Sequence, residues 1–253
     1  MLTTVTGIVL REKAWGESDK FIDILTEEAG LVSVCVKGGR KLGSKNAGAT
    51  QLYTYSKFCY SSRGTINTLN SSEVITSFFK ISEDLVKLSL ASYFSELLQF
   101  CVPESVPSNN VMRLVLNTFY FLDSSKRDAD FLKSVFEFRL LCEIGLMPDL
   151  IGCSECYKFT SNSMYFDILG GKLYCSECFK GELDFNTVRL GDSELHTLRH
   201  IALSDFDKLF NFKLSPELQK NVSSITEKYV LAHFDRNFKT LSFLKSIQGG
   251  DQI

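Results

Sequence analysis

The chain has 253 residues, of which 44% are hydrophobic, and a formal net charge of −2 at pH 7. This length suits one large domain or two to three small ones, and the charge balance shows no overall basic excess that would announce a nucleic-acid partner. No apolar run approaches the roughly 18 to 20 residues that span a bilayer, and the N-terminus has no signal-peptide pattern. We therefore expect a cytoplasmic protein with no membrane partner.

The first 79 residues have the pattern of short β-strands. Apolar, β-branched or aromatic runs cover residues 4–10, 21–26, 31–37, 52–60 and 65–69. The longest connection, residues 38–49, contains four glycines. Five short antiparallel strands in about 75 residues predict a small barrel, for which the OB-fold is the common five-stranded solution.

From residue 80 the apolar period becomes that of helices. Helical patterns cover residues 82–101, 109–122, 128–142, 192–202, 215–234 and 236–245. Asn109 or Asn110 is expected to cap the second of these, and Asp128 or Asp130 to open the third. Ser215 followed by Pro216 is a favourable helix start. The fold class is therefore expected to be α+β, with a barrel followed by a helical domain.

Four of the eight cysteines form two pairs with metal-ligand spacing. Cys153 and Cys156 make one CxxC pair, Cys175 and Cys178 make the other, and 18 residues separate the pairs. Gly170–Gly171 lies midway and predicts a hairpin that returns the chain to the first pair. Four thiolates leave no open position on the ion, so we expect one structural Zn²⁺ per chain.

Other interpretations of the four cysteines stay open. Thiolate ligands also hold iron–sulfur clusters, and a CxxC pair alone can be a redox site. Buried cysteines with no metal are the simplest alternative. The duplicated pair favours a metal over each of these.

A basic, glycine-rich segment follows the third predicted strand. No Asp or Glu occurs between Glu28 and Glu73, whereas six cations do, namely Lys37, Arg40, Lys41, Lys45, Lys57 and Arg63. Aromatic residues Tyr53, Tyr55, Phe58 and Tyr60 follow on the next predicted strand. Cations that track a phosphate backbone and rings that stack on bases are what single-strand-binding OB-folds use. The alternative is a solvated loop beside a strand whose rings are core.

These patterns divide the chain into four expected parts. Residues 1–79 form a DNA-binding OB-fold, residues 80–150 begin a helical domain, residues 151–180 form the zinc-binding module, and residues 181–253 complete the helical domain.

Motifs for enzymatic chemistry do not occur in the sequence. His196 and His200 are four residues apart, but a zinc protease would need Glu at position 197, where Thr stands. No phosphate-binding glycine motif or carboxylate cluster was found, so we expect no catalytic residues and no small-molecule substrate. Trp15, the single tryptophan, lies between the first two predicted strands and is expected to plug the end of the barrel rather than to be exposed for contact.

The order of several motifs resembles the RecO family of bacterial DNA repair proteins over nearly the whole chain. These motifs cover residues 7–10, 16–19, 26–30, 37–44, 136–148, 153–156, 229–241 and 246. The resemblance implies an N-terminal OB-fold and a helical domain with a zinc module. It also implies binding of single- and double-stranded DNA, annealing of complementary strands, and action with RecR to load a recombinase onto strands coated by single-strand-binding protein.

The resemblance further implies that the helical domain contacts the acidic C-terminal tail of single-strand-binding protein. Arg236 and Lys239, beside apolar residues at near-helical spacing, are candidates for that contact, although an ordinary amphipathic helix would show the same pattern. Nucleoid-associated action in the cytoplasm would follow from these partners. The rival function is a zinc-ribbon adaptor that binds only proteins and no DNA.

Overall fold

The computed structural model describes residues 2–249. The chain divides into two compact units, Met1–Lys126 together with Phe238–Ile253, and Arg127–Asn237. The end of the chain thus belongs to the unit that contains the N-terminus. The four-part division expected from the sequence stays a prediction.

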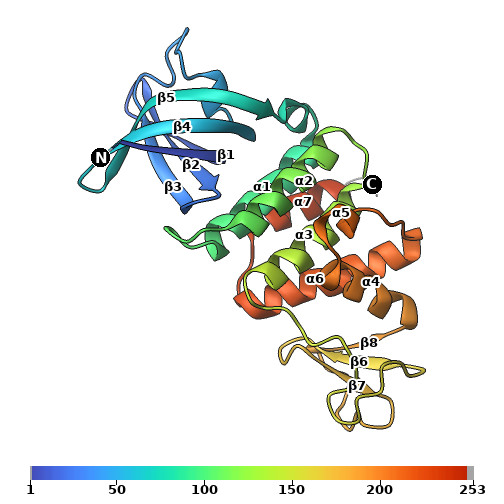
Figure 1. Ribbon diagram of the computed structural model, residues 1–253. Coiled ribbons are helices and arrows are strands. Elements are labelled where there is room, and N and C mark those ends of the chain that lie inside the picture. Colours follow the sequence, from blue (N-terminus) through green and yellow to red (C-terminus); the bar gives the residue numbers. More distant parts are fainter. Residues whose placement is uncertain (1, 250–253) are drawn as a thin grey trace. The chain divides into compact units, whose positions relative to one another are not determined.

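A closed five-stranded barrel begins the first unit (Figure 1). Its strands are β1 (Leu2–Trp15), β2 (Asp19–Thr26), β3 (Gly30–Val36), β4 (Thr54–Arg63) and β5 (Ile66–Ser77), in the spatial order β1-β2-β3-β5-β4. Alternate residues of β2, β3 and β4, among them Ile22, Val34 and Phe58, fill the interior. The expected OB-fold barrel is therefore confirmed, but the expectation that all its strands are antiparallel is wrong, because β3 and β5 pair in parallel.

β1 and β5 are much longer than their apolar runs. β1 pairs with β4 through its first half and with β2 through its second half, and its register shifts between Val9 and Arg11. Beyond Leu10 the strand continues with exposed side chains, ending at Trp15, which is 57% exposed. The expectation that Trp15 plugs the barrel is therefore wrong, because the strand carries this residue past the barrel core.

Three helices belong to the same unit: α1 (Leu85–Cys101), α2 (Asn109–Asp123) and α7 (Lys239–Gly249). Short 3₁₀ turns η1 (Gly48–Thr50) and η2 (Phe79–Glu83) lie within and after the barrel. Asp84 caps α1 by accepting the Lys87 N–H at 2.9 Å. The residue at the N-cap of α2 is Ser108, not Asn109 or Asn110, and its hydroxyl donates to the Thr26 carbonyl of the barrel.

The β2–β3 turn packs closely against the α1–α2 connection. Gly30 has φ +60°, and a Cβ there would lie 2.2 Å from the Pro103 carbonyl oxygen. Ser105 N–H donates to the Ala29 carbonyl at 2.8 Å. Only glycine fits this position, both because of its positive φ and because of the close approach.

The C-terminal helix α7 packs on α1. Phe238, just before α7, is buried and makes edge contacts with Tyr93 and Phe100 of α1. The Glu96 carboxylate accepts the Thr240 N–H and so caps the first turn of α7. The predicted start of this helix at residue 236 is wrong, because Asp235 adopts a left-handed conformation and α7 begins at Lys239.

The second unit joins helices to a small sheet. Its helices are α3 (Ala129–Glu143), α4 (Asp192–Leu203), α5 (Phe206–Leu209) and α6 (Pro216–Phe234), and its strands β6 (Met164–Asp167), β7 (Lys172–Cys175) and β8 (Thr187–Leu190) form a sheet of order β7-β6-β8. Asp128 and Ser215 cap α3 and α6 as expected. β6 and β7 form the hairpin predicted around Gly170–Gly171.

A buried ion cluster joins α3 to α6. The Lys133 ammonium lies 3.0 Å from both the Glu137 and the Glu227 carboxylates, and the Thr226 hydroxyl donates to Glu137. Because Glu137 is fully buried, removing Lys133 would leave an uncompensated carboxylate in the core. This cluster therefore fixes how α3 and α6 pack.

Within residues 2–249, no helix combines the length and the apolar character needed to cross a membrane.

Candidate metal centre and nucleic-acid interface

Two tight turns bring the four cysteines together at the β6–β7 hairpin. In the first turn, Tyr157 N–H donates to the Cys153 carbonyl and Cys153 N–H donates to the Lys158 carbonyl. Tyr157 adopts a positive φ of 60°, which reverses the chain. In the second turn, the N–H groups of Cys178 and Phe179 both donate to the Cys175 carbonyl. Each turn therefore directs its two thiols to the same side.

The four sulfur atoms have the spacing of a tetrahedral thiolate site. All four Sγ atoms lie within 4.8 Å of one another, and those of Cys156 and Cys175 are 3.6 Å apart. Four thiolates about 2.3 Å from one zinc ion would have sulfur atoms about 3.8 Å apart. Within residues 2–249, this is the only group of three or more His, Cys, Asp or Glu side chains close enough to share an ion. The cysteine cluster can bind a metal ion.

Proton affinity within the cluster differs from thiol to thiol. Burial alone would raise the pKa of Cys153, but hydrogen bonds from the backbone N–H groups of Cys156, Cys175 and Glu155 outweigh it and lower this pKa to about 6. Hydrogen bonding to the sulfurs of Cys156 and Cys175 raises the pKa of Cys178 to about 12. The backbone around Cys153 therefore favours its thiolate form, which is the form that binds a metal ion.

Arg199 of α4 holds the first cysteine turn from outside. Its guanidinium donates to the carbonyl oxygens of Leu150, Ile151 and Phe159 at 2.7 to 2.9 Å. The same group lies 3.8 Å from the centre of the Phe159 ring. One side chain therefore attaches the segment that carries Cys153 and Cys156 to the helical part of this unit.

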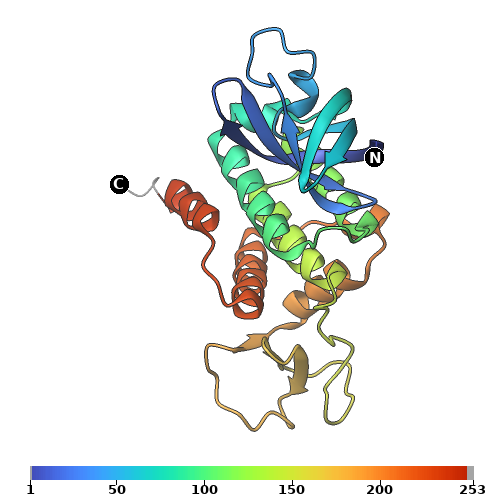
Figure 2. The ribbon, with the colours of Figure 1, turned by 90° about the vertical axis from the view of Figure 1, so that its left-hand side faces the viewer.

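The basic loop after β3 stands out from the barrel in Figures 1 and 2 and is anchored on the β1–β2 turn. Arg40 N–H donates to the Ser18 carbonyl at 2.9 Å, and its guanidinium donates to the carbonyls of Gly16 and Glu17. Gly38 N–H donates to the Asp19 carboxylate at 2.7 Å. The loop and the β1–β2 turn thus form one surface, which we call the basic surface.

The predicted DNA-binding cations are exposed. Within residues 2–249, none of the six forms an ion pair; they are Lys37, Arg40, Lys41, Lys45, Lys57 and Arg63. The four loop cations lie within nine residues of one another, whereas Lys57 is on β4 opposite Glu73 of β5, and Arg63 ends β4. The loop cations are therefore the densest uncompensated charge of the set.

The β4 aromatics are not a stacking platform. Tyr53, Phe58 and Tyr60 are buried in the first unit, and the hydroxyl of the half-buried Tyr55 donates to Glu27. Burial and the Glu27 charge raise the pKa of Tyr55 to about 12. The expectation that these rings stack on bases is wrong, because alternation along β4 directs most of them into the core.

Family comparisons cover both units. The model described as Recombination protein O N terminal matches residues 1–78, and Recombination protein O C terminal matches residues 82–242. The chain belongs to the RecO family of DNA repair proteins. Curated RecO relatives match nearly full length: a DNA repair protein RecO of Acetivibrio thermocellus is 30% identical over 96% of this chain and 96% of its own, and that of Symbiobacterium thermophilum is 30% identical over 98% of each.

Residues 136–148, one of the segments that resemble the RecO family, have a structural role that the sequence alone did not show. Arg139 of α3 donates to the carbonyls of Ile201, Ala202 and Ser204 at the end of α4, and pairs with Glu143 at 2.7 Å. These bonds satisfy carbonyls that the helix end leaves without partners. The i, i+4 spacing of Arg139 and Glu143 was the only local indication of this arrangement.

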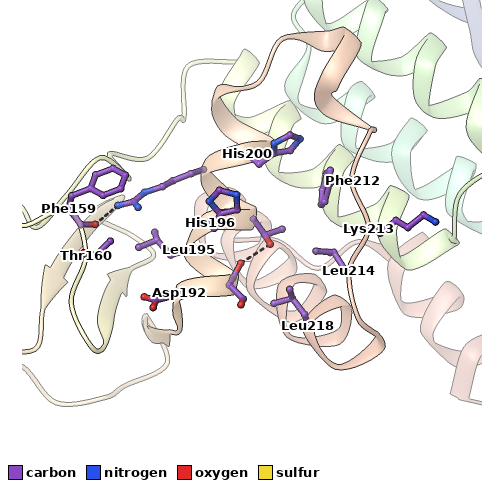
Figure 3. Close-up of a pocket in the computed structure, with 13 residues that line it drawn as sticks. Phe159, Thr160, Asp192, Leu195, His196, His200, Phe212, Lys213, Leu214 and Leu218 are labelled. Atoms are coloured by element: carbon purple, nitrogen blue, oxygen red, sulfur yellow. Dashed lines mark hydrogen bonds between the residues drawn. The ribbon is translucent and has the colours of Figure 1, made fainter.

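A cavity of about 640 Å³ lies beside α4, lined by the aromatic residues Phe159 and Phe212 and by His196 and His200 (Figure 3). Both histidines project from one face of α4, as the i, i+4 spacing predicted. The His200 ring packs edge-on against Phe212, and its Nε2 contacts the Lys208 carbonyl. Within residues 2–249, no third ligand joins them, so the pair is not a metal centre.

Arg236 and Lys239 fall at different structural positions. Arg236 precedes α7 and belongs to the second unit, whereas Lys239 is the first residue of α7 in the first unit. The near-helical spacing expected for them is therefore interrupted, and Phe238 between them is buried.

Proposed function

We propose that this RecO-family protein is a DNA-binding recombination mediator. It binds single- and double-stranded DNA, anneals complementary strands, and with RecR helps to load a recombinase onto strands coated by single-strand-binding protein. These steps need neutralised phosphates and displaced coat protein rather than an active site, so we propose that it is not an enzyme. It would act in the bacterial cytoplasm, at the nucleoid.

The observation that carries this proposal is the basic surface. Four exposed loop cations lie within nine residues of one another, namely Lys37, Arg40, Lys41 and Lys45, and none of them forms an ion pair with any residue in 2–249. Because the loop is anchored by Arg40 and Gly38 on the β1–β2 turn, its charges are presented by the barrel rather than by a free chain. Lys57 and Arg63 extend the proposed DNA path along β4. Phosphate neutralisation of this kind supplies most of the affinity for single strands.

The metal is proposed to be one structural Zn²⁺ per chain, held by Cys153, Cys156, Cys175 and Cys178. All-thiolate tetrahedral sites in proteins hold zinc or iron–sulfur clusters, and a site closed by four thiolates has no position for a substrate. The metal would stabilise the folded conformation of the cysteine module beside α4, and it would take no part in catalysis.

Arg236 and Lys239 are proposed as contacts for the acidic tail of single-strand-binding protein. Their charge suits that tail; Arg236 lies in the segment after α6, and Lys239 is the first residue of α7. Tail-peptide affinity should fall when both become Glu, with Lys220→Glu and Lys228→Glu on α6 as a control of equal charge change. Unchanged affinity of the Arg236/Lys239 variant would remove these residues from the contact.

An annealing assay tests the proposed function as a whole. Complementary strands coated with single-strand-binding protein should anneal faster with the protein present, without ATP, and a recombinase should load faster when RecR is added. A protein that binds other repair proteins but has no salt-dependent affinity for DNA and no effect on annealing would instead be the zinc-ribbon adaptor.

A further inference from the structure

The exposed indole of Trp15 is a feature that the proposed function does not yet use. Trp15 ends β1 and is 57% exposed. Its nearest ring, Phe21, contacts it edge to face at 5.5 Å between centroids, so that Phe21 covers at most one of the two faces of the indole. An indole left this open on a strand end contributes little to the barrel core.

The neighbours of Trp15 in sequence and in strand register include both a cation and an acid. Lys13 is two residues earlier and points to the same side of β1, and it pairs in register with Phe21. Trp15 itself pairs with Asp19, which accepts the Gly38 N–H.

Arg40 of the basic loop contacts the residues that follow Trp15, and Lys37 lies at the start of the same loop. The Arg40 guanidinium lies on the carbonyls of residues 16 and 17, which directly follow Trp15. Lys37 follows β3, whose last residue, Val36, pairs with Lys20 next to Asp19. Trp15 is therefore an exposed ring at the base of the basic surface.

We propose that Trp15 stacks on an unpaired base of single-stranded DNA bound along the basic surface. This inference rests on the proposed DNA-binding function and adds the residue that distinguishes single strands from duplex. The cations would bind the phosphate backbone, and the exposed ring would stack on a base that is free to rotate out of the strand. Bases inside a duplex are already stacked on each other, so a duplex offers no unstacked base to the indole ring.

Charge favours a nucleic acid over a protein as the occupant. Protein interfaces are depleted of Lys in their buried core, whereas Lys13 is two residues from Trp15 on β1 and Lys37 follows the end of β3 that pairs with Lys20. Stacking on an aromatic ring is tolerant of base sequence because every base has a π-face. We therefore expect sequence-independent recognition.

The ring can be observed directly, because Trp15 is the only tryptophan in the chain. Binding of an oligothymidylate should quench the intrinsic fluorescence of the full-length protein, whereas a duplex of the same length should leave it nearly unchanged. Binding of labelled DNA then gives the affinity of each variant. Trp15→Ala should weaken single-strand binding by about 5- to 150-fold, the range expected for one lost base–ring stack, and duplex binding by less than about two-fold. Trp15→Phe should retain most of the single-strand affinity.

Leu203→Ala is the matched control, because Leu203 is an exposed apolar side chain of similar exposure on α4, outside the basic surface. It should bind both DNA forms like the parent. Equal weakening of both forms by Trp15→Ala would mean a structural role, and unchanged DNA affinity with lost RecR binding would mean a protein contact; either overturns the inference. If the parent binds single strands with a steep salt dependence but Trp15→Ala matches it and fluorescence is not quenched, the inference falls and the proposed function stands. If the parent binds no DNA, both fall.

Discussion

At the scale of single residues, the half-buried Arg199 has a role that its position on a helix would not indicate. Three hydrogen bonds and the Phe159 ring tie it to the backbone that leads into and out of the first cysteine turn. Arg199→Ala should lower the free energy of unfolding by about 1–3 kcal/mol, because three carbonyls lose a charged donor. It should also speed metal release to a chelator. Denaturant unfolding and chelator kinetics measure these effects.

Lys208→Ala provides the comparison for Arg199, since Lys208 is an exposed cation of the same unit. Its unfolding free energy and chelator kinetics should match those of the parent. If Arg199→Ala behaves like Lys208→Ala, then the module does not depend on this attachment.

At the scale of elements, the two cysteine turns should act as one metal-dependent unit. Cys153→Ser should reduce metal content from close to one zinc per chain to near zero and lower the melting temperature, because metal binding contributes to the folding of such sites. Cys35→Ser, which changes another buried cysteine in the barrel, should keep its metal. Elemental analysis measures the metal content, and thermal unfolding measures the melting temperature. The assignment would be contradicted if the parent protein contained no stoichiometric metal and if chelators did not change its melting temperature.

The elements also show which features a sequence can reveal. β3 was predicted at residues 31–37 and spans Gly30–Val36, because the apolar residues Val32, Val34 and Val36 recur at every second position and are all buried. β5 was predicted to end at residue 69 but continues to Ser77, because its second half pairs with β4 while exposing Val74 and Ile75. A strand paired on one side and open to solvent has no alternation to detect. The four-residue elements β8 and α5 were missed because they are too short to show a period.

At the scale of the whole molecule, residues distant in sequence decide what local patterns cannot. The start of α7 depends on Glu96, which is 144 residues before Thr240. The buried charge of Glu137 depends on Lys133, Glu227 and Thr226. The cysteine spacing, by contrast, is local and was sufficient to predict the cluster. The exposure of Trp15 could not be predicted, because it depends on how far β1 continues past the barrel.

The most direct test of the central claim is the salt dependence of single-strand binding by a loop variant. Lys37, Arg40, Lys41 and Lys45 are replaced together by Ala. The slope of log affinity against log salt is about −0.7 per phosphate contact, so four lost contacts should make it shallower by up to about 3 units. Stability should change little because the replaced charges are exposed, and metal content should not change.

The matched control replaces four exposed lysines of the second unit, Lys180, Lys208, Lys213 and Lys220, and so changes net charge equally. It should keep the parent's slope. A folded, metal-loaded loop variant that binds single-stranded DNA with the parent's affinity and salt slope would contradict the account and place the DNA-binding surface elsewhere in the chain.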